Sequence, residues 1–202
     1  MSPEHYFSAQ PATADERREL DVRLAGRELS VTTARGVFSA DHVDQGTSVL
    51  LPLIQDDDAP GDVLDLGCGW GPIALSLALQ RPHQVVHAVD VNERALDLVR
   101  LNASHLGVTV RASLPDAVDP DLRFTEIWSN PPIRVGKEAL HELLLRWLPR
   151  LAPGGVAHLV VQKNLGSDSL HKWLESGVLP GTSTTRTTTS KGFRVLSLRS
   201  SG

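Results

Sequence analysis

The sequence predicts an α/β protein built on a doubly wound, mostly parallel β-sheet. Apolar runs of strand length alternate with runs of helical length from residue 62 onward, which is typical of a parallel sheet covered by helices. A buried strand at 62–66 runs directly into a turn with three glycines, at 67–71, and then into a helix at Pro72. The 202 residues are enough to bury a core as one domain spanning 1–202.

Residues 1–45 are expected to form an N-terminal arm and a β-hairpin. Strand-length runs at 21–25 and 29–33 flank the turn at Gly26. The arm contains an aromatic pair, Tyr6 and Phe7, which either packs on the domain or covers a substrate. Apolar residues at helical spacing in 48–55 then predict a helix that packs beside the sheet.

Residues 46–202 are expected to form the core, as a sheet of seven strands. Asn92 suits a helix N-cap and Glu93 suits the first turn of that helix. The Lys191-Gly192 turn joins two strand-like segments and predicts a closing antiparallel hairpin. Strands are expected at 62–66, 84–89, 108–111, 124–129, 156–162, 182–190 and 193–199, and helices at 72–80, 92–106, 137–150 and 167–176.

The composition favours a soluble cytoplasmic protein without a metal site. Hydrophobic residues make up 41% of the chain, and no run reaches the ~18 apolar residues of a membrane span. The N-terminus has no basic-then-apolar signal sequence. The single cysteine excludes an internal disulfide and fits a reducing compartment. The eight histidines show no metal-ligand spacing.

Charge is distributed unevenly along the chain. Residues 123–202 hold 11 of the 20 Lys and Arg residues but only 5 of the 24 Asp and Glu residues. Such asymmetry either marks a surface that faces nucleic acid or is a chance excess of surface cations.

The glycine turn predicts a ligand site at the end of the first core strand. Gly67, Gly69 and Gly71 let the backbone approach a ligand without an intervening Cβ, although a tight turn alone has the same pattern. The spacing differs from the dinucleotide fingerprint Gly-x-Gly-x-x-Gly. With Asp65 two residues before it, the turn resembles motif I of the class I S-adenosylmethionine-dependent methyltransferases. Asp90 ends the second strand, where an acid is placed to accept ribose hydroxyls.

A second motif, Asn130-Pro131-Pro132, follows the strand expected beside the first one. Proline fixes φ and donates no hydrogen bond, so stiff carbonyls directed outward are expected beside the Asn130 oxygen. Such a pair of acceptors suits an exocyclic NH₂ group, because accepting from both N–H groups favours the pyramidal nitrogen and the positive charge that grows during attack. The alternative is a plain strand-to-loop turn.

Together these segments resemble the small-domain methyltransferases related to the small-subunit ribosomal RNA guanine-N2 methyltransferase. The resemblance runs over nearly the whole chain, and the segment from Asn130 to Lys137 is its most specific part. The matching segments are His5-Tyr6-Phe7-Ser8, Gly36-Val37-Phe38-Ser39, Val43-Asp44-Gln45-Gly46, Leu64 to Pro72, Val89 to Ala95, Asn130 to Lys137, Val161-Gln162-Lys163 and Lys191 to Val195.

The resemblance implies a Rossmann-like class I methyltransferase fold that binds S-adenosyl-L-methionine and releases S-adenosyl-L-homocysteine. It implies that Asp65, Gly67 and Gly69 hold the methionine end and Asp90 the ribose. Catalytic contacts to the target amine are carried over to Asn130, Pro131 and Pro132. The remaining cofactor-binding residues are Phe38, Ser39, Gly46, Cys68, Gly71 and Val91, with Asn130 counted there too. We interpret Cys68 as a small filler rather than a nucleophile.

The predicted reaction is methylation of a guanine N2 in ribosomal RNA or the small ribosomal subunit, by a protein expected to be monomeric. Residues expected to contact RNA are Ile133, Arg134, Lys137, Lys163, Lys191 and Arg194, the cations among them because they belong to the basic half. Ile133 replaces the aromatic residue of many Asn-Pro-Pro enzymes, so base stacking would fall to Phe7, Phe38 or Arg134. The loop 112–115 lacks the acid that often meets the adenine amine, and whether Asp116 substitutes for it is open.

Three alternatives remain open at this point. The same pair of acceptors would serve the amide of a protein glutamine. A non-catalytic assembly factor would bind the cofactor and RNA without transferring a methyl group. A dehydrogenase is a remote alternative, because the glycine spacing disfavours it.

Overall fold

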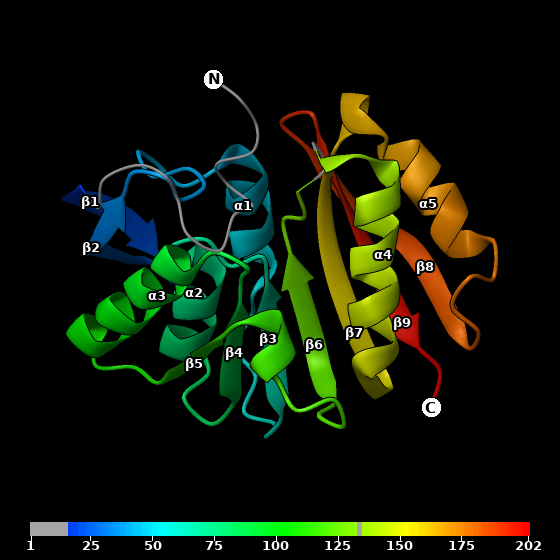
Figure 1. Cartoon of the computed structure of the whole chain (residues 1–202). Coiled ribbons are helices and arrows are strands. Elements are labelled where there is room, and N and C mark those ends of the chain that lie inside the picture. The colour runs from blue at the N-terminus through cyan, green and yellow to red at the C-terminus, as the bar shows by residue number, and fades with distance from the viewer. Residues whose placement is uncertain (1–15, 133–134) are drawn as a thin grey trace.

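The computed structural model describes residues 16–132 and 135–202, and its main element is a seven-stranded sheet (Figure 1). The strand order is β5-β4-β3-β6-β7-β9-β8. The aromatic arm 5–8 and the residues Ile133 and Arg134 lie outside the described residues. The strands are β3 (Asp62–Leu66), β4 (Val85–Val89), β5 (Val110–Ser113), β6 (Phe124–Ser129), β7 (Leu151–Gln162), β8 (Thr182–Ser190) and β9 (Phe193–Ser200).

The sheet is mostly parallel, as predicted. β3 pairs in parallel with β4 on one side and with β6 on the other. β9 runs antiparallel to both β7 and β8, which gives the predicted closing hairpin. The strand order reverses between β3 and β6, and ligands of open α/β sheets bind beyond the carboxyl ends of the strands at such a point.

Helices cover both faces of this sheet. α1 (Gln45–Leu50), α2 (Pro72–Gln80) and α3 (Glu93–Leu106) pack on one face. α4 (Lys137–Trp147) and α5 (Ser167–Glu175) pack on the other (Figure 1). Short 3-10 turns lie at η2 (Leu51–Leu53), η3 (Pro115–Ala117), η5 (Leu148–Arg150) and η6 (Lys163–Leu165). In the described part of the chain, no helix is long and apolar enough to cross a membrane.

The N-terminal hairpin, β1 (Arg17–Leu24) with β2 (Arg27–Ala34), is confirmed and is longer than predicted. Its apolar side packs on Trp70 and on α3. The Asn102 side chain accepts a hydrogen bond from the Thr32 N–H at 2.7 Å and donates one to the Thr32 carbonyl at 3.0 Å. These two hydrogen bonds fix the hairpin to α3.

Several element boundaries differ from the prediction, such as β5 at Val110–Ser113 instead of 108–111 and the end of α4 at Trp147 instead of 150. Two further differences have local reasons. α1 begins at Gln45 rather than Ser48, because the Asp44 carboxylate caps it by accepting from Gly46 N at 2.7 Å and Thr47 N at 3.2 Å. β7 begins at Leu151 rather than 156, and the register between β6 and β7 shifts there. Gly155 permits this, because a Cβ on it would lie 2.9 to 3.0 Å from three backbone oxygens.

Candidate active site

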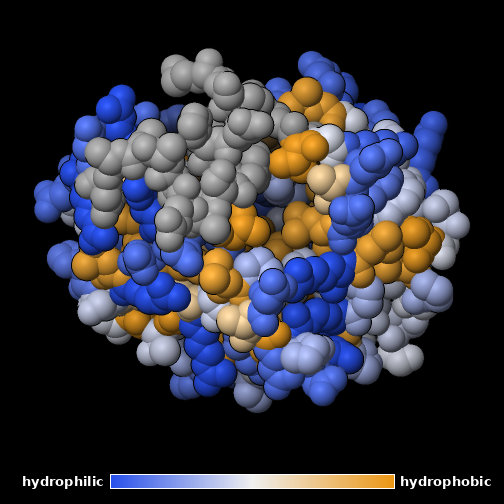
Figure 2. Space-filling model, in the orientation of Figure 1, coloured by the Kyte–Doolittle hydropathy of each residue, from blue (hydrophilic) through white to orange (hydrophobic). Residues whose placement is uncertain are grey.

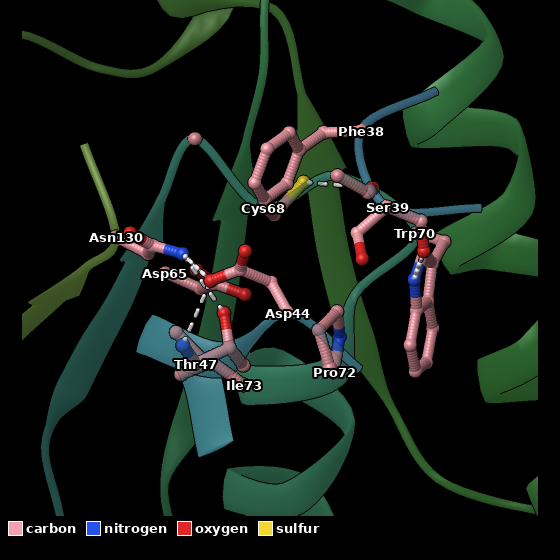
Figure 3. A pocket seen from close by; sticks show the side chains of 12 residues that line it. Phe38, Ser39, Asp44, Thr47, Asp65, Cys68, Trp70, Pro72, Ile73 and Asn130 are labelled. Carbon is pink, nitrogen blue, oxygen red and sulfur yellow. Dashed lines mark hydrogen bonds between the residues drawn. The ribbon is translucent and has the colours of Figure 1, made fainter. Parts of the chain in front are cut away.

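A pocket lies at the carboxyl ends of β3 and β6, beside the start of α1 (Figure 3). In Figure 2, hydrophobic residues gather around a hollow in the middle of the visible face. The pocket combines residues from three stretches of the chain, 38–47, 65–73 and Asn130. Its lining residues are Phe38, Ser39, Asp44, Thr47, Asp65, Gly67, Cys68, Gly69, Trp70, Pro72, Ile73 and Asn130.

The glycine turn after β3 forms one wall of the pocket. Gly67 and Gly69 have φ of +76° and +54°, values that L-residues rarely adopt. The N–H groups of Gly67 and Cys68 donate to the Val89 carbonyl at 2.8 and 3.1 Å. A Cβ on Gly67 would meet no atom of the described residues within 4 Å. The space in front of Gly67 is therefore free for a ligand.

Gly71 serves close helix packing and does not line the pocket, so its role in cofactor binding stays a prediction. Its φ is +95°, and it stands at the N-cap of α2. A Cβ on Gly71 would lie 2.9 Å from Cγ2 of Val99 on α3. The glycine is needed here because α2 and α3 approach closely.

Asp65 places a buried carboxylate in the pocket. Its Oδ2 accepts from the Ala74 N–H at 2.9 Å, whereas its Oδ1 has no hydrogen-bond partner among the described residues. Burial raises the pKa of Asp65 from 3.8 to about 7, against the Ala74 hydrogen bond and with a smaller contribution from the nearby Asp90. A buried acceptor without a partner is costly, so this oxygen suits a cationic or N–H-donating group of a ligand.

Asp90, at the end of β4, supports the glycine turn directly. Its Oδ2 accepts from Gly69 N and its Oδ1 from Asn92 N, both at 2.9 Å. Burial raises the pKa of Asp90, and the backbone hydrogen bonds oppose this shift. Asp90 does not line the pocket itself, and the adjacent Val91 is 41% exposed. The proposed ribose contact of Asp90 therefore stays a prediction.

Cys68 is buried between the glycines. Burial, first of all, raises the pKa of its thiol. A neutral, buried thiol is a weak nucleophile, which supports the interpretation of Cys68 as a small filler. Among the described residues, no three His, Cys, Asp or Glu side chains are grouped to hold a metal ion.

Asn130 lies in the same pocket and points toward α1 (Figure 3). Its Nδ2 donates to Asp44 Oδ2 at 2.7 Å and to Thr47 Oγ1 at 3.2 Å. The preceding Ser129 is fixed by a hydrogen bond from its Oγ to the Leu66 carbonyl at 2.7 Å. The glycine turn and the Asn-Pro-Pro motif, separated by some 60 residues in sequence, are thus brought together.

Pro131 is buried, and the Pro132 carbonyl accepts a hydrogen bond from Val135 N at 3.2 Å. The expectation that both proline carbonyls point outward is therefore wrong for Pro132. The physical reason is that the chain turns at this point, and the turn uses the Pro132 oxygen.

Asp44, Thr47 and Trp70 line the pocket but were not assigned to it from the sequence. The sequence does contain one signal for Asp44, because aspartate is a common N-cap residue. The predicted helix start at Ser48 placed Asp44 too far ahead of the helix to be recognised as its cap. Trp70 donates from Nε1 to the Ser39 carbonyl at 3.1 Å. That contact holds Ser39, whose φ is +50°, and the 47% exposed Phe38 at the mouth of the pocket.

Gly46 belongs to the site by packing rather than by lining the pocket. A Cβ on it would lie 3.0 Å from Asp44 Oδ2 and 3.1 Å from both Asn130 Oδ1 and Phe193 Cε1. Gly46 therefore leaves room for the Asn130 side chain.

Lys137, Lys163 and Lys191 are exposed, and all three follow the carboxyl ends of β6 and β7 or the β8–β9 turn beside them. The turn is joined to η6 by a hydrogen bond from Lys163 N to the Gly192 carbonyl at 2.8 Å. Arg194 corrects the prediction of an RNA contact. It is 9% exposed and pairs with Asp168 and, at 3.2 Å, with Ser167 Oγ, because its position in β9 directs it under α5.

The adenine-side candidate, Asp116, is exposed and forms an ion pair with Arg146 at 2.7 Å. It does not line the pocket. Its role in cofactor binding is unsupported by the geometry.

Comparison with known proteins matches residues 28–197 to the methyltransferase small domain. An uncharacterized protein of Bacillus subtilis, YbxB, is 36% identical over 85% of this chain and 88% of its own length. The ribosomal RNA small subunit methyltransferase C of Shewanella amazonensis is 30% identical over 82% of this chain and 50% of its own length. This chain thus spans about half the length of the ribosomal RNA methyltransferases that it matches.

The solved structures agree on the fold. The 16S rRNA N2 methyltransferase (RsmC) of Thermus thermophilus, in complex with AdoMet and guanosine, superposes with a TM-score of 0.74 at 24% identity. The superposition covers 94% of this chain and 52% of that chain. The chain belongs to the methyltransferase small domain family of S-adenosylmethionine-dependent enzymes, as its motifs predict.

Proposed function

We propose that this protein transfers the methyl group of S-adenosyl-L-methionine to the exocyclic N2 of a guanine in small-subunit ribosomal RNA. The observation that carries the proposal is the Asn130 amide. Its NH₂ group is used by Asp44 and Thr47, so its Oδ1 remains as an acceptor for the N–H of an incoming amine. The names of the relatives support the choice of ribosomal RNA.

The residues of the pocket fit this cofactor. Asp65 Oδ1, buried and without a partner in the described residues, suits the ammonium of the methionine end. Gly67 offers open space beside the glycine turn, and Asp90 fixes that turn by accepting from Gly69 N. The bound cofactor supplies an activated methyl group on a sulfonium, which is an excellent leaving group.

The chain's own contribution to the chemistry is to position and polarise the amine. An exocyclic nitrogen is a poor nucleophile, because its lone pair is delocalised into the ring. Acceptance of its N–H groups by Asn130 Oδ1 and the Pro131 carbonyl favours the pyramidal nitrogen and stabilises the charge that develops in the transition state. In-line placement at the β3–β6 crevice supplies much of the remaining rate.

The exposed Lys137, Lys163 and Lys191 support an RNA partner. They follow β6 and β7 or lie in the β8–β9 turn, whereas Arg146, Arg186 and Arg199 contact acids or carbonyls of the protein. We propose that these lysines bind phosphates around an unpaired or flipped guanine, in the cytoplasm where ribosomal subunits assemble.

The test is methyl transfer from labelled cofactor to small subunits that lack the modification, with the product nucleoside identified by mass spectrometry. Wild-type protein should yield N2-methylguanosine. Asn130→Ala should lower kcat by about 10² or more while cofactor affinity, measured by calorimetry, is retained. Label in protein glutamine instead of RNA would reject the guanine target. An active Asn130→Ala variant would reject the catalytic role of this amide.

A further inference from the structure

We propose that Asp44 is a positioning residue that fixes the orientation of the Asn130 amide and thereby restricts the site to substrates that donate an N–H. This inference deepens the proposed function and rests on it. Asp44 comes from the loop before α1, and Asn130 comes from the end of β6, so the contact joins segments 86 residues apart. Figure 3 shows Asn130, Asp44 and Thr47 pointing toward one another.

The hydrogen-bond inventory of the three side chains determines the orientation. Asp44 Oδ2 accepts from Asn130 Nδ2 at 2.7 Å, and Thr47 Oγ1 accepts from the same nitrogen at 3.2 Å. A carboxylate only accepts hydrogen bonds. Rotating the amide by 180° would place Asn130 Oδ1 against Asp44 Oδ2 and leave two acceptors in contact without a proton between them.

The remaining acceptor of Asn130 is left open. Asn130 Oδ1 receives no hydrogen bond from the described residues, and it is not among their fully buried polar atoms without a partner. Asn130 is only partly buried and lines the pocket, so an amine in the pocket would meet this oxygen. An incoming amine finds an acceptor at this point, whereas a carbonyl or ether oxygen would face a like dipole.

Asp44 is itself held firmly, which makes it a suitable reference for Asn130. Its Oδ2 also accepts from Gly46 N at 2.7 Å and Thr47 N at 3.2 Å, as the N-cap of α1. Gly46 packs against both side chains, since a Cβ there would lie about 3 Å from Asp44 Oδ2 and Asn130 Oδ1 alike. The start of α1 and the Asn130 amide therefore form one tightly packed unit.

Two substitutions at Asp44 separate orientation from helix capping. Asp44→Ser keeps an N-cap side chain but is too short to reach Asn130. Asp44→Asn keeps both the cap and an oxygen able to accept from Asn130 Nδ2, and it removes only the charge. Asp41→Ser is the matched control, because Asp41 is an exposed aspartate of the same loop and does not line the pocket.

Methyl transfer to the guanine amine should fall about 10²-fold in kcat in Asp44→Ser and less than about 10-fold in Asp44→Asn. Asp41→Ser should match wild type. Equal losses in Asp44→Ser and Asp44→Asn would overturn the inference, because they would assign the effect to the charge. Full activity of Asp44→Ser would overturn it as well.

A second readout needs no catalysis. The side-chain NH₂ signals of Asn130, assigned in a ¹⁵N spectrum by their loss in Asn130→Ala, should persist in Asp44→Asn and shift with faster hydrogen exchange in Asp44→Ser. Unchanged signals in Asp44→Ser would overturn the orientation by Asp44. If the Asp44 variants show this spectral response but the wild-type protein methylates no amine, the proposed function is rejected and the orientation by Asp44 stands, so the two failures are distinguishable.

Discussion

At the scale of single residues, Asp65 shows how the site stores an unfavourable interaction in the free protein. The side chain is 1% exposed, and one of its oxygens has no partner among the described residues. Burial raises its pKa to about 7. A ligand ammonium would favour the ionised form, so binding of the proposed cofactor should strengthen as pH rises through about 7.

The stability of the free protein should respond to pH in the opposite direction. Because the folded-state pKa of Asp65 lies above 3.8, the folded state holds an extra proton between about pH 4 and 7. This contribution to the free energy of unfolding is fully present below pH 3.8 and is lost as pH rises through about 7.

Asp65→Asn removes this titration. From pH 5.5 to pH 8, the variant should gain about 2 kcal/mol in unfolding free energy relative to wild type, because each pKa unit is worth 1.36 kcal/mol. It should also bind the cofactor weakly at both pH values. Urea denaturation and calorimetry at the two pH values provide the measurement. A difference in unfolding free energy between variant and wild type that is the same at both pH values would contradict this account of Asp65.

At the scale of elements, two turns need a glycine with positive φ, but only one of them belongs to the pocket. Gly67 joins β3 to the helix region at φ +76°, and Gly26 joins β1 to β2 at φ +73°. Within the part of the chain that the structure describes, a Cβ on either glycine would meet nothing within 4 Å. The two positions therefore carry the same backbone strain, and only Gly67 lines the pocket.

Gly67→Ala and Gly26→Ala should each destabilise the fold by about 1–2 kcal/mol, the cost of a left-handed L-residue. Gly67→Ala should also weaken cofactor binding by at least about 10-fold, because its methyl group would occupy space needed by the ligand. Gly26→Ala should bind the cofactor as wild type does. Denaturation curves and calorimetry compare the pair, and equal cofactor affinity would show that no ligand approaches Gly67.

The loop 35–44, which contributes Phe38 and Ser39 to the pocket, is held by hydrogen bonds from two other segments of the chain. Asn92 caps α3 by accepting from Arg94 N at 3.0 Å, and it donates from Nδ2 to the Gly36 carbonyl at 2.8 Å. Trp70 holds the same loop at Ser39. The loop that presents Phe38 is thus anchored by the elements that follow β3 and β4.

At the scale of the whole molecule, most lysines of the basic half lie at one edge of the sheet. The chain contains four lysines, and three of them, Lys137, Lys163 and Lys191, are exposed at the carboxyl edge of the sheet. Lys172 stands apart in the last turn of α5. Bound phosphates release counterions, so lysines that contact RNA determine the salt dependence of binding.

The double variant Lys163→Gln, Lys191→Gln should bind small-subunit RNA fragments more weakly, whatever the nucleotide sequence of the fragment. The slope of log K against log salt concentration should decrease by about 1.4, at roughly 0.7 for each contact with single-stranded RNA. Lys172→Gln is the control and should leave the slope unchanged. Fluorescence titrations at several salt concentrations measure it, and an unchanged slope in the double variant would exclude these lysines from the RNA surface.

The sequence by itself determined the order of strands and helices, the glycine turn and the Asn-Pro-Pro motif, because these depend on periodicity and on backbone rules that act over a few residues. The prediction that Arg194 is a surface cation was wrong, because the sequence shows the charge of a residue but not its burial. The structure places Arg194 beneath α5, paired with Asp168. The packing role of Gly71 was hidden for the same reason, since its neighbour Val99 lies on another helix.

Tertiary structure alone decided which side chains meet. Asp44 and Asn130 are 86 residues apart, and their hydrogen bond exists because β6 pairs with β3 and the N-terminus of α1 lies beside the carboxyl end of β6. The sequence supplied the chemistry of each group, since residue type fixes what donates and what accepts. Folding supplied the distances between groups, because long-range packing determines which of the many possible partners are brought within bonding range.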